Sequence, residues 1–244
     1  MKKTVIFLIS VLFIFLPTQV LAQKRVPILV YHSIDEFTGS GSQELYVTPE
    51  SFEEQIKYLR DHGFTLLTFE NWEDIDHVDK PIFLTFDDGY KNNEYAFKIF
   101  KKLQNESFKP KGTIFVISDF IGRANRLTKN DLKTMSDSGN MSIQSHTATH
   151  PDLTKINNFE KELKQSKEKI QQITGQPVIA LAYPYGNFND KVVAETKKYY
   201  QYGLTTTPGP YIKSGIKNEL YYLPRIYIKY STTLDEFAKI VEGV

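Results

Sequence analysis

Short apolar runs alternate with longer amphipathic segments along the chain after residue 26. Apolar runs of this kind are typical of buried parallel strands, and segments with apolar residues three or four positions apart are typical of helices packed on a sheet. We expect strands at 27–31, 64–69, 82–86, 112–117, 141–145, 178–183, 202–206 and 222–228. We expect helices after Thr48, at 95–103, 128–138, 158–174 and 190–200, and after Thr233. About seven strand–helix units in one chain predict an α/β fold whose parallel sheet forms a closed or nearly closed barrel.

Local signals indicate where several of these helices begin and end. Thr48 precedes a proline, which is favoured at the first helical position. Thr128 and Asp131 resemble a capping box, and the same pattern follows Thr233. Gly175 ends the longest predicted helix.

The N-terminal segment has a composition different from the rest. Two lysines precede an apolar run over 4–16, and the compact residues Val-Leu-Ala stand at 20–22. This pattern predicts a secretory signal peptide at 1–22, with the mature domain at 23–244 secreted or associated with the cell surface or cell wall. The apolar run is too short for a comfortable membrane span, although an uncleaved anchor is the alternative.

Composition excludes several classes of protein. The chain contains no cysteine, which excludes disulfide bonds and an anchor attached through a cysteine. Its formal net charge is +1 and would be −1 without Lys2 and Lys3, so no basic field indicates a nucleic-acid partner. Aromatic residues make up 14% of the chain, and Trp72 with the many tyrosines could line a sugar-binding groove or belong to the core.

Two segments carry the chemistry: TFDDG at 85–89 and HTATH at 146–150. Each follows a predicted strand, so both belong at the carboxyl edge of the sheet, where barrel enzymes hold their active sites. One carboxylate and two imidazoles form a three-ligand site for a zinc-like ion with a position left for water. The remaining carboxylate is then available as a base, which suits metal-assisted hydrolysis.

Each of these segments also has an ordinary structural interpretation. Asp-Gly is common turn chemistry, and a lone histidine is usually a surface or core residue. The spacing of His146 and His150 matches the zinc-peptidase pattern H-E-x-x-H, but no glutamate follows His146, which disfavours a peptidase. His62 and His77 stand in polar surroundings and are expected at the surface.

The two motifs, in this order, resemble the first two motifs of the polysaccharide deacetylase family, which is the NodB-homology domain of carbohydrate esterase family 4. The resemblance covers essentially all of 23–244 and implies a distorted (β/α) barrel. It implies that Asp87 is the catalytic base and that a divalent metal is bound by Asp88, His146 and His150. Zn²⁺ is the expected metal, with Co²⁺ or Ni²⁺ as alternatives.

The third motif of the family is altered in this chain. It reads LAYPYG at 181–186, and Ala182 stands where many relatives have an arginine that orients the catalytic aspartate. A similar sequence is found in the poly-N-acetylglucosamine deacetylases of biofilm systems. The resemblance implies that the backbone N–H of Tyr185 serves the oxyanion hole, although Pro-Tyr-Gly is also a plain turn. Tyr183 is then at most a wall of the groove.

The C-terminal Leu-x-His motif, which supplies the general acid in many relatives, is missing, because no histidine follows His150. The biofilm branch has a catalytic histidine on its first strand, and by that similarity we assign the general acid to His32. Arg225, in the segment LPRI, either takes the place of the missing arginine or forms an ordinary salt bridge.

The resemblance implies an enzyme that hydrolyses the N-acetyl amide of N-acetylglucosamine residues in an extracellular or cell-wall polysaccharide and releases acetate. Peptidoglycan and chitin oligomers are alternative substrates, and a metal-containing wall protein that binds glycans without turnover is an alternative function. The expected partner is the polysaccharide, held in an open groove of a monomer, with no nucleic acid and no stable membrane span once the signal peptide is removed.

Overall fold

The structure, a computed structural model, describes residues 23–243. The signal peptide expected at 1–22 lies outside the described residues, and both that segment and the domain boundary after it stay predictions. Within 23–243, no helix is both long and apolar enough to cross a membrane.

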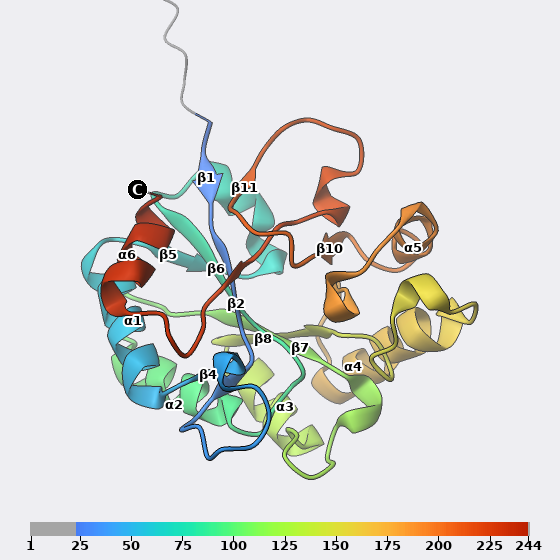
Figure 1. The fold of residues 1–244 in the computed structure, drawn as a ribbon, viewed down its shortest axis with the longest axis horizontal. Helices are drawn as coiled ribbons and strands as arrows, with labels where there is room; N and C mark the ends of the chain where they lie inside the picture. Colours follow the sequence, from blue (N-terminus) through green and yellow to red (C-terminus); the bar gives the residue numbers. More distant parts are fainter. Residues whose placement is uncertain (1–22, 244) are drawn as a thin grey trace, which may run out of the picture.

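A parallel sheet forms the centre of the molecule (Figure 1). Its strands lie in the order β10 (Tyr202–Leu204), β9 (Ala180–Ala182), β8 (Met141–Ser145), β7 (Gly112–Val116), β6 (Pro81–Phe86), β2 (Ile28–Tyr31) and β12 (Ile226–Tyr227), and β5 (Thr65–Leu67) pairs with the start of β6. Two short pairs lie outside this sheet: β1 (Arg25–Val26) with β11 (Tyr211–Ile212), and β3 (Ser33–Ile34) with β4 (Tyr46–Val47). The predicted parallel α/β fold is confirmed.

The segment before β12 brings the two edges of the sheet together. The backbone N–H of Leu223 donates to the carbonyl of Gly203 in β10, and that of Arg225 donates to the carbonyl of Thr207, both at 3.0 Å. β12 itself pairs with β2 at the opposite edge. The sheet therefore curls into a distorted barrel whose seam is closed by this one segment.

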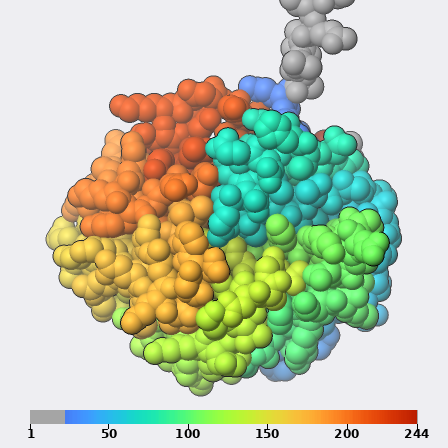
Figure 2. All heavy atoms as spheres, turned by 180° about the vertical axis from the view of Figure 1, so that it is seen from behind, coloured from blue at the N-terminus to red at the C-terminus, as the bar shows by residue number. Residues whose placement is uncertain are grey.

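Helices cover the outside of the sheet (Figure 1). They are α1 (Pro49–Asp61), α2 (Asn93–Leu103), α3 (Lys129–Asp137), α4 (Ser166–Thr174), α5 (Asp190–Thr196) and α6 (Leu234–Glu242). Seen from behind, late segments in orange lie directly against early segments in teal (Figure 2). This close packing of segments far apart in sequence is what a closed arrangement of strands requires.

The capping signals act as the sequence predicts. The Thr48 hydroxyl accepts a hydrogen bond from the Ser51 N–H at 3.1 Å, with proline at the first position of α1. Thr128 and Thr233 each head a complete capping box at the start of α3 and α6. Gly175 ends α4 in the left-handed conformation, with φ of 72°.

The long helix expected at 158–174 is interrupted. Its first part is a π-helical turn, η5 (Glu160–Gln165), and only Ser166–Thr174 is α-helical. A π turn is wider than an α turn, and such turns are frequent at functional sites. Here two adjacent residues, Glu162 and Leu163, are buried. The apolar periodicity of the sequence could not predict this, because Glu162 is charged.

The strand expected at 222–228 is reduced to Ile226–Tyr227. Residues 219–221 form a 3₁₀ turn (η7), and the residues that follow bond to the opposite edge of the sheet before β12 starts. The strand expected at 64–69 ends at Leu67, because Phe69 begins the 3₁₀ segment η2 (Phe69–Asp76).

Two apolar clusters occupy the two faces of the sheet. Along β6, Leu84 and Phe86 pack outward with the helices, whereas Phe83 belongs to a separate inner cluster. This alternation follows from the two-residue period of a strand. The inner cluster is dominated by rings: Phe69, Trp72, Phe83, Phe115, Tyr202 and Tyr211. Trp72 is therefore a core residue, and its alternative role in a groove is wrong.

We predict that Phe83→Ala lowers the free energy of unfolding by about 3–5 kcal/mol, because it opens a cavity among packed rings. The Phe83 side chain is fully buried, with ring centroids 5.1 Å from Phe69 and 5.4 Å from Trp72. Urea unfolding followed by circular dichroism measures the loss. Ile216→Ala, at a residue that is 62% exposed, should change stability by less than about 0.5 kcal/mol. Equal losses in the two variants would contradict this assignment of the core.

Candidate active site

The chemistry-bearing residues meet at the carboxyl ends of adjacent strands. Asp87 follows β6, and its N–H donates to the carbonyl of Tyr31 at the end of β2, at 2.9 Å. His146 follows β8, and its N–H donates to the carbonyl of Val116 at the end of β7, also at 2.9 Å. His32 continues from β2 in the same register. The convergence expected from the strand positions is therefore present.

Asp88, His146 and His150 form a cluster with the geometry of a metal site. The Oδ1 atom of Asp88 lies 3.7 Å from Nε2 of each histidine, and one ligand atom from each residue lies within 4.8 Å of the others. Ligand atoms around a tetrahedral zinc ion are about 3.3–3.6 Å apart. The three residues therefore fit a divalent cation, and the carboxylate–imidazole donor set suits zinc, cobalt or nickel.

The protein fixes the tautomer of His146. Its Nδ1 donates to the carbonyl of Ala182 at 2.8 Å, which leaves Nε2 with a free lone pair facing Asp88. Metal-binding histidines are usually oriented in this way, by a hydrogen bond from the ring nitrogen that does not bind the metal. Ala182 thus contributes through its backbone, although the family resemblance drew attention to its side chain.

The mouth of the barrel is built from strained backbone. Among residues 23–243, seven residues other than glycine have positive φ, and four of them lie in the three motifs. These four are Asp88 at 71°, Thr147 at 68°, His150 at 62° and Tyr185 at 60°. Each such residue costs about 1–3 kcal/mol and persists only where its surroundings enforce it.

Asp87 is held by a buried ion pair with Arg225. The guanidinium donates from Nη1 to Oδ1 at 2.7 Å and from Nη2 to Oδ2 at 2.8 Å, and the two residues are 3% and 1% exposed. Arg225 also donates from Nε to the carbonyl of Thr205 and from Nη1 to the hydroxyl of Thr85. The sequence left open whether Arg225 orients the catalytic aspartate or forms an ordinary salt bridge, and in the structure its partner is Asp87 itself.

This pair keeps the Asp87 carboxylate ionised. Burial by itself would raise the pKa of Asp87, but the charge of Arg225, then that of His146 and the hydrogen bonds from Arg225, hold the pKa well below its usual value. Asp87 lies beside the three candidate metal ligands, and its Oδ2 is 3.9 Å from Nε2 of His146.

His32 is half-buried and stacks on Tyr227, with ring centroids 5.6 Å apart and planes at 13°. Its carbonyl accepts a hydrogen bond from Nδ2 of Asn93 at 2.7 Å. Burial lowers the pKa of His32, while the charges of Asp87 and Asp88 oppose that effect. The imidazole therefore lies within electrostatic reach of both carboxylates.

Two tyrosines of the third motif have different environments. Tyr185 is 64% exposed, and its ring meets that of His150 nearly at right angles, with centroids 4.7 Å apart. Tyr183 is fully buried and donates to the carbonyl of Tyr221 at 3.2 Å, so it is a packing residue and not a wall of the groove.

His62 and His77 are exposed, as predicted.

Sequence reasoning missed Glu162 of η5. Its side chain is buried and accepts hydrogen bonds from the loop that carries both metal-site histidines. The surrounding sequence is rich in lysine and glutamate, which is typical of a solvated helix face, and no local signal separates this glutamate from its neighbours.

Comparison with known proteins identifies the family. The family model described as polysaccharide deacetylase matches residues 74–204, more than half of the chain. The protein YxkH of Bacillus subtilis, itself named as a candidate polysaccharide deacetylase, is 31% identical over 229 residues, which cover 90% of this chain and 77% of YxkH. The chain belongs to the polysaccharide deacetylase family.

Two further members of the polysaccharide deacetylase family are similar to this chain. The crystal structure of BC0361, a polysaccharide deacetylase from Bacillus cereus, matches with a TM-score of 0.89 and 52% identity, covering 90% of this chain and 69% of that one. The poly-β-1,6-N-acetyl-D-glucosamine N-deacetylase of Staphylococcus epidermidis is 30% identical over 190 residues, covering 68% of this chain and 64% of that protein. The distorted barrel implied by the resemblance is thereby confirmed.

We predict that Arg225→Met lowers the free energy of unfolding of the metal-free protein by about 3–5 kcal/mol at neutral pH, because it leaves the Asp87 charge buried and unpaired. In the wild type, the pKa of Asp87 is lower in the folded state than in the unfolded state, where it is about 4. This difference stabilises the fold at pH values above the unfolded-state pKa, and the stabilisation is lost as the pH falls toward the folded-state pKa. In the variant, burial raises the pKa instead, so the deficit shrinks as pH falls.

Urea unfolding over a series of pH values measures this deficit. Adding Asp87→Asn to Arg225→Met removes the unpaired charge and should recover part of the lost stability. A deficit that is constant with pH, or a double variant no more stable than Arg225→Met alone, would show that the ion pair does not set the pKa of Asp87.

Proposed function

We propose that this polysaccharide deacetylase removes N-acetyl groups from N-acetylglucosamine residues of an extracellular or cell-wall polysaccharide and releases acetate. The observation that carries the proposal is an ionised, Arg225-bound Asp87 beside a three-residue metal cluster at the mouth of the barrel. The similarity to the Staphylococcus epidermidis enzyme favours a β-1,6-linked polymer of N-acetylglucosamine as the substrate.

In the proposed mechanism, Asp87 is the general base. It accepts a proton from the attacking water, and the arginine fixes the plane of the carboxylate while each oxygen keeps a further lone pair for that water. A divalent cation held by Asp88, His146 and His150 would polarise the acetyl oxygen and lower the pKa of water enough for a base as weak as Asp87.

The other two assigned residues act on the oxyanion and on the leaving group. The backbone N–H of Tyr185, whose peptide is turned by its positive φ, donates to the oxygen that becomes negative. His32 donates a proton to the nitrogen as the carbon–nitrogen bond breaks, and Tyr227 holds the imidazole plane. One water is consumed, and the products are acetate and a glucosamine residue.

The site of action follows from the N-terminal segment. We propose that residues 1–22 direct export and that 23–244 is a monomeric catalytic domain acting outside the cell or at the cell wall, with no nucleic-acid partner. The pattern of lysines, apolar run and compact residues before position 23 supports export.

A direct test combines residues 23–244 with zinc, cobalt or nickel in separate samples. Oligomers of N-acetylglucosamine with β-1,4 or β-1,6 linkages are added, and loss of acetyl groups is read by mass spectrometry. We expect release of acetate from the β-1,6 series, abolished by a chelator. Metal binding without release from either series would favour peptidoglycan as substrate or a glycan-binding role without turnover.

In the same assay, we predict that Asp87→Asn lowers kcat by about 10²–10⁴-fold, because the amide cannot accept the proton of water. The metal ligands are untouched, so metal content measured by atomic absorption should equal that of the wild type. His146→Ala is the matched control and should lose both metal and activity. Activity of Asp87→Asn within a few-fold of wild type would remove Asp87 from the role of base.

We further predict that His32→Gln lowers kcat by about 10²–10⁴-fold and removes the alkaline limb of the pH profile of kcat/KM. A general acid must be protonated, so activity that depends on His32 falls as the pH rises through the pKa of His32. The matched control is Tyr227→Phe, which keeps the ring that stacks on His32. An alkaline limb that persists in His32→Gln would assign the acid to another group.

A further inference from the structure

We propose that Glu162 is a positioning residue that sets the geometry of the metal site by holding the backbone of the loop at 146–150. The inference rests on the proposed metal-binding role of His146 and His150, since those are the side chains that the loop carries. Glu162 touches neither the metal cluster nor a reacting atom, so its effect is transmitted through the loop.

The five backbone N–H groups of the loop are all accounted for. His146 donates to the carbonyl of Val116, Thr147 to the hydroxyl of Ser145, and His150 to the hydroxyl of Thr147. The two central amides donate to one carboxylate oxygen, Oε2 of Glu162, at 3.0 and 2.8 Å. A backbone amide buried without a partner is costly, so a turn of this shape requires an acceptor at that position.

The second oxygen of Glu162 is also used. Oε1 accepts a hydrogen bond from the hydroxyl of Thr149 at 2.8 Å, so the carboxylate binds three donors of the loop in total. The residue is 6% exposed, and it lies 12 positions or more beyond the loop in sequence. The π-helical turn η5 makes this reach possible, because it turns both Glu162 and Leu163 toward the interior.

The carbonyl groups of the loop are held from another element. In the 3₁₀ turn η3 (Ser118–Phe120), the N–H of Ser118 donates to the carbonyl of Thr147 at 3.0 Å, and that of Asp119 donates to the carbonyl of Ala148 at 2.9 Å. The two central peptide groups of the loop are therefore hydrogen-bonded on both sides. Their carbonyls accept from η3, and their N–H groups donate to Glu162.

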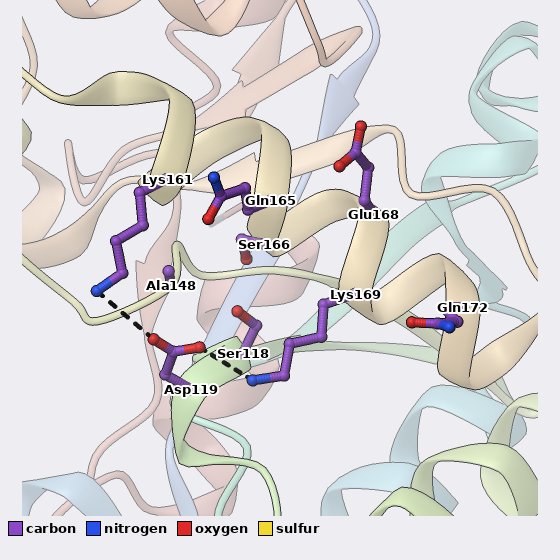
Figure 3. A pocket seen from close by; sticks show the side chains of 9 residues that line it. All are labelled: Ser118, Asp119, Ala148, Lys161, Gln165, Ser166, Glu168, Lys169 and Gln172. Carbon is purple, nitrogen blue, oxygen red and sulfur yellow. Dashed lines mark hydrogen bonds and ion pairs between the residues drawn. The ribbon is translucent and has the colours of Figure 1, made fainter.

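Ion pairs join η3 to the helical segment formed by η5 and α4, which carries Glu162. The carboxylate of Asp119 lies 2.9 Å from Nζ of Lys169 on α4 and 3.7 Å from Nζ of Lys161 on η5 (Figure 3). A pocket of about 480 Å³ lies between η3 and this helix, with Ala148 of the loop among its lining residues (Figure 3). Two ion pairs thus connect η3 to η5 and α4 beside this pocket.

These contacts determine where the imidazole of His150 lies relative to that of His146. Thr147 and His150 have φ of 68° and 62°, conformations that the isolated sequence would leave. Without the carboxylate, the amides of Ala148 and Thr149 lose their acceptor, and the turn relaxes toward ordinary backbone angles. His150 is then displaced relative to His146, which is fixed separately by the carbonyl of Ala182.

The test measures metal affinity, not turnover. Metal-free protein is titrated with Zn²⁺ in competition with a chromophoric chelator, and the absorption spectrum of the Co²⁺-loaded protein reports ligand geometry. We expect Glu162→Ala to bind Zn²⁺ about 10–100-fold more weakly, as outer-shell substitutions do, with an altered Co²⁺ spectrum. Glu162→Gln retains an acceptor oxygen for the two amides and should restore most of the affinity.

Two further variants separate positioning from folding. Glu160→Ala, on the same turn, removes an exposed carboxylate whose one ion pair among residues 23–243 is with Lys164, and it should bind Zn²⁺ as the wild type does. Thr149→Val removes only the contact to Oε1, so it should weaken Zn²⁺ binding with an unchanged thermal unfolding midpoint in the metal-free state. If Glu162→Ala does not fold, Glu162→Gln and Thr149→Val carry the comparison.

The outcomes distinguish the two proposals. Wild-type Zn²⁺ affinity and Co²⁺ spectrum in Glu162→Ala, or in Thr149→Val where Glu162→Ala does not fold, overturn the positioning role and leave the proposed deacetylase untouched. A loss in Glu162→Gln as large as in Glu162→Ala also overturns it, because charge and not loop geometry would then be responsible. A wild-type protein that binds no divalent cation overturns the proposed function and this inference together.

Discussion

The buried ion pair between Asp87 and Arg225 is the interaction on which the rest of the site depends. It joins the end of the central strand β6 to the segment that closes the seam of the barrel, and both partners are almost completely removed from solvent. Two charges removed from water are tolerated only with close geometry and further hydrogen bonds, and Thr85 and Thr205 supply these to the arginine. One contact therefore links closure of the fold with the ionisation state of the assigned base.

The position of Arg225 shows how a site can be kept while its sequence motif changes. The family resemblance draws attention to residue 182, where this chain has alanine, and the guanidinium that contacts Asp87 instead comes from 43 positions later. The two positions lie near the same end of the barrel because the chain before β12 pairs with β10, which is the neighbour of β9. The side chain of Arg225 therefore reaches the carboxylate from the segment that closes the seam.

The mouth of the barrel and the inner apolar cluster have opposite physical characters. The inner cluster consists of packed rings around Phe83 and Trp72, where burial of apolar surface stabilises the fold. The mouth collects positive φ angles, an ion pair and a turn whose amides depend on Glu162. The free energy lost to backbone strain at the mouth is offset by apolar packing in the inner cluster and between the sheet and its helices.

The sequence by itself determined the parallel α/β fold, most strand positions, four helix caps and the grouping of one carboxylate at 87–88 with His146 and His150. These follow from local rules: apolar periodicity, capping chemistry, and the fact that parallel strands end at one edge. Tertiary structure alone decided that Arg225 reaches Asp87, that Trp72 lies in the core and that Glu162 holds the loop. Each of these depends on how segments far apart in sequence pack, and a charged residue on an amphipathic helix has the same local pattern whether it faces solvent or a buried amide.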